Sequence, residues 1–156
     1  MKITTISTSL LFTLVILLSG CVSPKFTGSA IPENILTAKP QVLVINDAET
    51  RDGFQHAVEG WLDSEEIRYV VEPEGVEHDP QQLTIEYVGY WSWDLALFLS
   101  RAEIEAFYQG QRVSKITYNA PSTLHTAKFG DADERIKLML DVMFANKSLQ
   151  EATDKL

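Results

Sequence analysis

The stretch Arg101-Ala-Glu-Ile-Glu-Ala-Phe-Tyr-Gln-Gly110-Gln-Arg-Val-Ser-Lys-Ile-Thr-Tyr118 decides how the chain folds. Small or apolar residues alternate with charged ones before Gly110, which is typical of a half-buried strand, and Val113–Tyr118 after it is another run suited to a strand. Gln109-Gly110 supplies the turn that joins two antiparallel strands. We therefore predict a long hairpin in which Asp94–Tyr108 pairs with Gln111–Asn119.

A helix is the alternative for the first half of this stretch. Ser100 and Glu103 have the spacing of a capping box, and Gly110 stands where such a helix would end. The hairpin is favoured because it accounts for the residues on both sides of Gly110 at once.

Two other segments have the period of amphipathic helices. The first is expected to begin after Thr50 as its N-cap, and one face of it carries Phe54, Ala57, Val58, Trp61 and Leu62. The second opens at Asp131, which forms a capping-box pair with Glu134, and its apolar stripe consists of Ile136, Met139, Leu140, Met143 and Phe144.

Shorter strands are expected on either side of the first helix. Val42–Ile45 is a β-branched run typical of a buried strand, Ile67–Glu72 alternates weakly, and Leu83–Val88 alternates clearly. Each helix and strand presents one apolar side, so each needs the others to cover it. The predicted fold class is α+β, with a single mostly antiparallel sheet of four to five strands and two helices on one face.

The chain divides into four segments by composition. Residues 1–20 have the pattern of a signal peptide, and residues 21–40 are rich in proline, glycine and serine, which predicts a flexible tether after Cys21. The α+β domain is expected over residues 41–146, followed by a polar tail over residues 147–156 that would fray.

The amino-terminal segment carries an apolar run, Leu10–Leu18, that is too short to span a bilayer. Small residues follow it and lead into the only cysteine of the chain, so that Leu18-Ser-Gly-Cys21 resembles the lipobox of bacterial lipoproteins. The resemblance implies cleavage before Cys21, a diacylglycerol on its thiol and an acyl chain on its new amino group. In that family an Asp directly after the cysteine favours the inner membrane. The residue here is Val22, which implies the outer membrane with the domain in the periplasm. An ordinary signal peptide with a chance cysteine is the alternative.

Aromatic residues gather at Tyr90, Trp91 and Trp93, just before the predicted hairpin. Trp and Tyr are frequent anchors in binding interfaces, which makes these three residues the candidate binding site. The alternative is that their rings cover a sheet face as part of the core.

The same region resembles a family of small Gram-negative lipoproteins to which no chemistry is attached. The resemblance is carried by Tyr90-Trp-Ser-Trp-Asp-Leu-Ala-Leu97 and by Ala102-Glu-Ile104, Gly110, Val113 and Tyr118. It implies a lipid-anchored envelope protein without catalytic residues.

More loosely, the order of elements is similar to the amino-terminal domain of TolB, which implies an accessory role in an envelope machine.

Composition argues against several classes of function. The net charge of −9 disfavours nucleic acid as a partner, and no cofactor motif is present. The acidic loop Glu72–Gln82 lacks the order of ligands in a calcium hand, so no metal is expected. Ser122, His125 and Asp131 have the letters of a catalytic triad, but they lie in one loop without a nucleophile elbow.

The sequence thus predicts an outer-membrane-anchored periplasmic lipoprotein, bound to the membrane through Cys21. It would act as a non-enzymatic binding or scaffolding module for an envelope protein or wall component. An accessory subunit or regulator of an envelope transport or wall-building machine is the first alternative. A small hydrolase using His125 or the acidic loop is the second.

Overall fold

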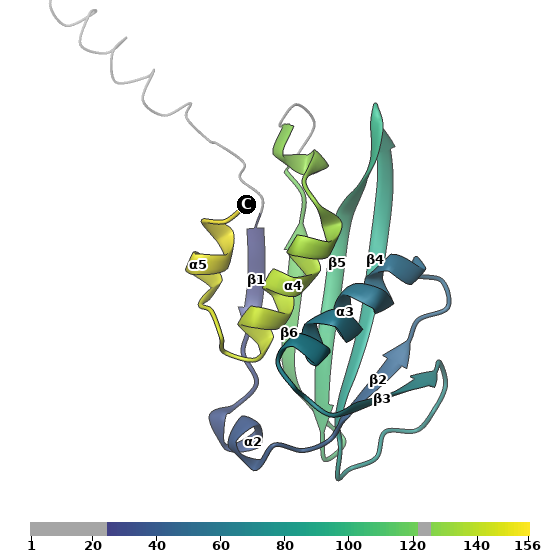
Figure 1. Ribbon diagram of the computed structural model, residues 1–156, viewed down its shortest axis with the longest axis vertical. Coiled ribbons are helices and arrows are strands. Elements are labelled where there is room, and N and C mark those ends of the chain that lie inside the picture. The colour runs from purple at the N-terminus through teal and green to yellow at the C-terminus, as the bar shows by residue number, and fades with distance from the viewer. Residues whose placement is uncertain (1–24, 122–125) are drawn as a thin grey trace, which may run out of the picture.

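The computed structural model describes residues 25–121 and 126–156, which form one mixed sheet with helices packed across it (Figure 1). The elements in chain order are β1 (Lys25–Ser29), α2 (Glu33–Ala38), β2 (Val42–Asn46), α3 (Asp52–Ser64), β3 (Tyr69–Pro73), β4 (Leu83–Asp94), β5 (Ala96–Tyr108), β6 (Gln111–Asn119), the 3-10 turn η1 (Thr126–Phe129), α4 (Ala132–Met143) and α5 (Leu149–Thr153). The predicted class, α+β, is confirmed. No helix among the described residues is long and apolar enough to cross a membrane.

The predicted hairpin is confirmed over residues 101–108, which pair with Gln111–Asn119 as the antiparallel strands β5 and β6, and Ile104 lies opposite Ile116. The predicted start at Asp94 is wrong, because Asp94 belongs to β4 and the residues of β5 before Arg101 pair with β4. Ala102, Ile104 and Ala106 are buried in the core, whereas Glu103 and Glu105 lie on the other face of the sheet. Strand β4 pairs with β5 in turn, so that β4, β5 and β6 form an antiparallel meander.

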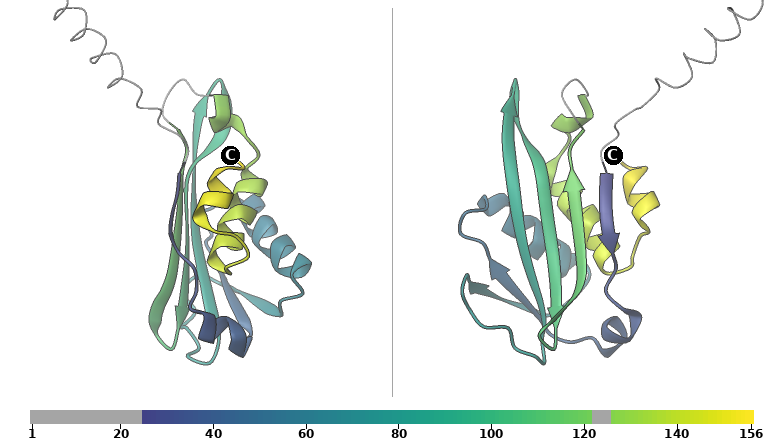
Figure 2. Two further views of the ribbon diagram at one scale, coloured as in Figure 1. Left: turned by 90° about the vertical axis from the view of Figure 1, so that its left-hand side faces the viewer. Right: turned by 180° about the vertical axis from the view of Figure 1, so that it is seen from behind.

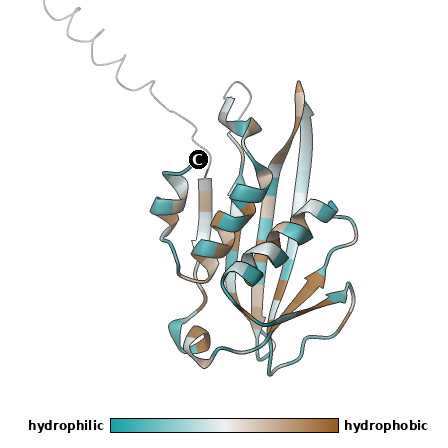
Figure 3. Cartoon of the chain, in the orientation of Figure 1, coloured by the Kyte–Doolittle hydropathy of each residue, from teal (hydrophilic) through white to brown (hydrophobic). Residues whose placement is uncertain are grey.

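The sheet itself is larger than predicted. It has six strands in the order β1-β6-β5-β4-β2-β3. It is also mixed, because β2 runs parallel to both β3 and β4. A parallel pair needs a long crossover, and helix α3 provides it between β2 and β3. Figure 3 shows β2 as a continuously apolar strand, as a parallel strand in the interior of a sheet should be.

The flexible tether expected over residues 21–40 is wrong for the part that the structure describes. Lys25–Ser29 forms strand β1 at one edge of the sheet, and Glu33–Ala38 forms helix α2. Phe26 packs against Tyr118 with ring centroids 5.4 Å apart, and the Ile31 amide donates to the Met143 carbonyl over 2.8 Å. The apolar residues that hold this segment are too widely spaced to produce a local period.

The fraying tail expected over residues 147–156 is also wrong. Ser148 and Glu151 form a complete capping box that starts helix α5. Ala152 is fully buried and joins the core, so the helix packs rather than frays. The folded unit therefore extends beyond the predicted limits of 41 and 146 at both ends.

Helices α3 and α4 lie side by side on one face of the sheet, as predicted (Figure 2). The α3 stripe of Phe54, Val58 and Leu62 is completely buried between the helix and the sheet. The expected N-cap is wrong, because helix α3 begins after Arg51 and the Thr50 hydroxyl instead donates to Asp47 over 2.6 Å. Asp131 does cap helix α4, and its carboxylate accepts from the Asp133 amide.

Candidate functional site

The β4–β5 hairpin projects beyond the rest of the sheet. Tyr90 is paired with Arg101, and Arg101 is paired on its other side with Asn119, the last residue of β6. Residues 91–100 continue past this level as a two-stranded ribbon, which we call the hairpin tip and which rises above the other strands in Figure 1. A β-bulge marks its base, where the Ser100 hydroxyl donates to the Tyr90 carbonyl over 2.9 Å.

The far end of the hairpin tip is apolar and open to solvent. Trp93 is 74% exposed, Leu95 is 85% exposed and Leu97 is 48% exposed. Trp93 and Leu97 are cross-strand partners, so the three side chains lie together around the turn. Clustered exposed side chains of this size are typical of an interaction surface rather than of a solvated loop.

The three aromatic residues of the predicted binding site do not act as one surface. Trp91 is half-buried at the base of the tip, edge-on to Phe54 of α3 at 6.4 Å and covered by the Arg51 guanidinium at 5.9 Å. Tyr90 is half-exposed with the Arg101 guanidinium 5.7 Å from its ring. Of the three, Trp93 is the most exposed, whereas Trp91 is partly covered by the helix side of the domain, so the prediction that these three residues bind a partner together stays a prediction.

The 3-10 turn η1 supports the tip. Phe98 and Phe129 meet edge to face at 5.7 Å, and the Lys128 ammonium lies 5.5 and 5.1 Å from their ring centroids. The buried Lys128 also forms an ion pair with Asp94, beside the turn. These contacts tie the ribbon to the body of the domain on the side that β6 leaves open.

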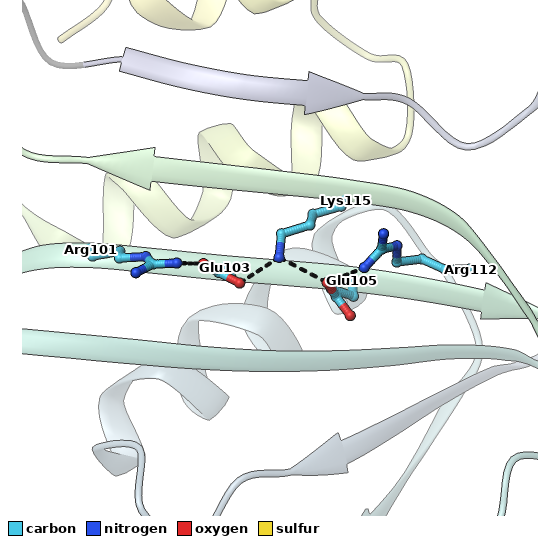
Figure 4. Close-up of polar contacts among 5 residues, drawn as sticks. All are labelled: Arg101, Glu103, Glu105, Arg112 and Lys115. Atoms are coloured by element: carbon cyan, nitrogen blue, oxygen red, sulfur yellow. Dashed lines mark hydrogen bonds and ion pairs between the residues drawn. The ribbon is translucent and has the colours of Figure 1, made fainter.

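The face of the sheet opposite the helices carries a ladder of ion pairs (Figure 4). Lys115 bridges Glu103 and Glu105 with N–O distances of 2.6 and 3.0 Å, and Arg101 and Arg112 complete the two ends. The hydrogen bond from Lys115 lowers the pKa of Glu103, and the same bond raises the pKa of Lys115. The network holds three cationic and two anionic side chains, and each carboxylate is paired with more than one of the cations.

Comparison with known proteins gives a fold and no family. No family model and no curated protein sequence matches the chain. Among solved structures, the chain is similar to a PelC variant from Paraburkholderia phytofirmans, solved as a dodecamer. The two share 12% sequence identity and a TM-score of 0.50, over 83% of this chain and 97% of that one. At this identity the likeness shows a shared fold alone.

The remaining candidates from the sequence lie apart from the tip. In the acidic loop, His78 Nε2 lies 2.8 Å from Glu86 and its ring packs on Phe107. Within residues 25–121 and 126–156, no three His, Cys, Asp or Glu side chains are gathered as metal ligands. Cys21, Ser122 and His125 lie outside the described residues.

The sequence reasoning missed Leu95 and Leu97. They follow Trp93 at alternate positions, and that spacing was available as a signal. They were not predicted because the turn between β4 and β5 was not recognised. The sequence predicted a turn at Gly110, whereas the turn at Leu95 contains no glycine or asparagine.

Proposed function

We propose that the chain is a lipoprotein of the outer membrane, anchored through Cys21 with its domain in the periplasm. It acts there as a non-enzymatic binding or scaffolding module. The observation that carries the binding role is the exposed apolar end of the hairpin tip, formed by Trp93, Leu95 and Leu97. Covering a side chain of this size gives about 1.5–3 kcal/mol, so a partner gains affinity from this surface.

The position of β1 supports the anchored arrangement. Cys21 precedes Lys25, the first residue of β1, by four residues. A chain of that length spans at most about 14 Å. A lipid on Cys21 therefore keeps the folded domain close to its membrane. A domain held this close can contact only partners at or near the membrane surface.

A subunit of an oligomeric envelope machine is the second candidate. It is favoured by the similarity to PelC, which was solved as a dodecamer. Strands β1 and β3 are the two edges of the sheet and offer pairing groups to a neighbouring copy. Native mass spectrometry of the detergent-extracted protein distinguishes the two candidates, since a ring gives a single high-order mass and the module gives a monomer.

The anchor is tested by replacing the cysteine. Wild-type chain expressed in a Gram-negative host takes up labelled palmitate and sediments with outer membranes, because several acyl chains together give stable anchoring. Cys21→Ser is expected to lose the label and to remain uncleaved or to appear in the soluble fraction. Normal labelling of Cys21→Ser would refute the proposal.

The binding role is tested at the tip. A photo-crosslinking residue in place of Trp93 is expected to capture an envelope component in intact cells, whereas the same residue in place of Gln111 is not. Gln111 is the matched control, because it is exposed and lies at the turn between β5 and β6, at the other end of strand β5 from the tip. Equal capture at both positions would remove the tip as the binding surface.

A further inference from the structure

We infer that the hairpin tip is a second membrane contact, and that its partner is the lipid bilayer that holds Cys21. This inference rests on the proposed lipid anchor and names the partner of the apolar tip. It follows from the register of the sheet, the length of chain before β1 and the chemistry of the tip.

The register places the anchor and the tip at the same end of the molecule. Lys25 pairs with Asn119, Asn119 pairs with Arg101, and Arg101 pairs with Tyr90, so these four residues share one level across the sheet. All four strands run antiparallel to their neighbours in this row. The chain therefore enters β1 from the end toward which the tip projects, and the views of the fold agree (Figures 1 and 2).

The tip and the chain segment before β1 reach similar distances beyond this level, toward the same end of the molecule. Leu95 is five residues beyond Tyr90, which at the rise of an antiparallel strand is about 17 Å. Cys21 is four residues before Lys25 and reaches at most about 14 Å in that direction. When the sheet stands upright on the membrane, the tip therefore extends as far as the lipidated cysteine, and Leu95 enters the headgroup region.

The tip has the composition of an interfacial anchor. Trp is enriched at the membrane–water interface, and Leu95 and Leu97 add apolar area on either side of the turn. The one carboxylate of residues 90–98 is Asp94, and its ion pair with the buried Lys128 reduces the cost of bringing it to lipid. Leu95 has a φ of 62°, a conformation in which Gly or Asn is usual. Among the described residues, the most exposed large apolar side chain thus stands at a position where glycine or asparagine would be less strained.

A second copy of the chain is the competing occupant of this surface. It is less favoured because the tip is a narrow two-stranded ribbon, whereas a stable dimer needs about 800 Å² on each partner. The bilayer requires no matching shape, and the anchor already holds the tip against it.

The test places a reporter at the tip of the full lipidated protein. Leu95→Cys and, as the control, Gln111→Cys each introduce one free thiol, because Cys21 is the only native cysteine and its sulfur is held in the thioether to diacylglycerol. In each variant the introduced thiol is labelled with an environment-sensitive nitrobenzoxadiazole dye. The protein is then reconstituted into vesicles of phosphatidylethanolamine and phosphatidylglycerol that contain nitroxide-labelled phosphatidylcholine.

Lipid-borne nitroxide is expected to quench the dye at position 95 at least about threefold more than at position 111, with a blue-shifted emission at 95. Adding Trp93→Ser to Leu95→Cys should reduce that quenching while the unfolding midpoint stays unchanged. Equal quenching at the two positions, with labelled palmitate present on Cys21, would overturn this inference and leave the anchor standing. Absence of the acyl label would overturn both.

Protection of the dye at 95 from aqueous iodide that rises with protein concentration, without quenching from the lipid, would also overturn the inference. In that case a second copy covers the tip.

Discussion

At the residue scale, Glu103 has the most defined electrostatic surroundings on the open face of the sheet. Its carboxylate is 14% exposed and lies between the Arg101 guanidinium and the Lys115 ammonium. The hydrogen bond from Lys115 lowers its pKa below the ordinary value of 4.5, and burial opposes the shift. A carboxyl group whose pKa is lowered on folding stabilises the fold above its unfolded pKa. That stability is lost as the pH falls through the folded pKa.

Glu103→Gln is expected to lower the free energy of unfolding by about 0.5–1 kcal/mol at pH 7. The difference between wild type and variant should shrink as the pH falls below 4.5, because the unfolded chain then binds a proton at this carboxyl and the folded chain binds it only at its lowered pKa. Urea denaturation at pH 7 and at pH 3 measures both values. Glu77→Gln, in the exposed acidic loop, is the control and should change stability little at either pH. A difference at Glu103 that does not depend on pH would contradict this account of the ladder.

At the scale of the element, β1 is the strand that joins the anchored end to the domain. Its attachment depends on Gly28, which has a φ of 137° and lies against β6. A Cβ at this position would lie 1.9 Å from the Lys115 carbonyl oxygen, a backbone atom that cannot give way. Only glycine therefore permits the pairing of Gly28 with Ile116.

Gly28→Ala is expected to displace β1 and to cost more than about 2 kcal/mol of stability. Hydrogen exchange should show lost protection of amides in β1 and along the adjoining edge of β6. Gly60→Ala is the matched control, because no atom lies within 4 Å of a Cβ at that position in α3. That change should stabilise the protein by about 0.5–1 kcal/mol, since alanine is the better helix former. Equal stability of the two variants would show that β1 is not tightly docked.

At the scale of the whole molecule, one core joins the sheet, the two large helices and both ends of the folded unit. Trp61 of α3 is buried, and its ring is tilted against that of Phe144 with the centroids 4.9 Å apart. Its indole nitrogen donates to Asp141 of α4 over 2.9 Å. Leu140 is completely buried on the adjacent helix. The exposed Trp93 is not part of this core, so the proposed contact surface is separate from the residues that stabilise the fold.

Trp61→Ala and Leu140→Ala are each expected to destabilise the fold by about 2–5 kcal/mol, because each leaves a cavity in the core. Trp93→Ala should change stability by less than about 0.5 kcal/mol, since its ring is mostly in solvent. Chemical denaturation of the three variants measures these values. A large loss of stability in Trp93→Ala would mean that the tip is part of the core and not a contact surface.

The elements with a local sequence pattern were predicted from the sequence alone. The β5–β6 hairpin, helix α3 and helix α4 were predicted because each repeats an apolar period within its own residues. Strand β1 and helix α5 were not, because Phe26, Ile31 and Ala152 become buried only through contact with distant residues. The parallel pairing of β2 with β3 and β4 was not predicted for the same reason. A run of apolar residues indicates a buried strand but not whether the neighbouring strands run parallel or antiparallel to it.

The candidate binding site was likewise predicted only in part from the sequence. The sequence marked Tyr90, Trp91 and Trp93 as unusual, but it could not say which ring is exposed. Trp91 and Trp93 alternate in β4 and so point to the same face of the ribbon. Only the tertiary structure separates them, because helix α3 brings Phe54 and Arg51 against Trp91 and leaves Trp93 74% exposed. The exposure of a ring depends on which residues pack against it, and here those residues are about 40 positions away in the sequence.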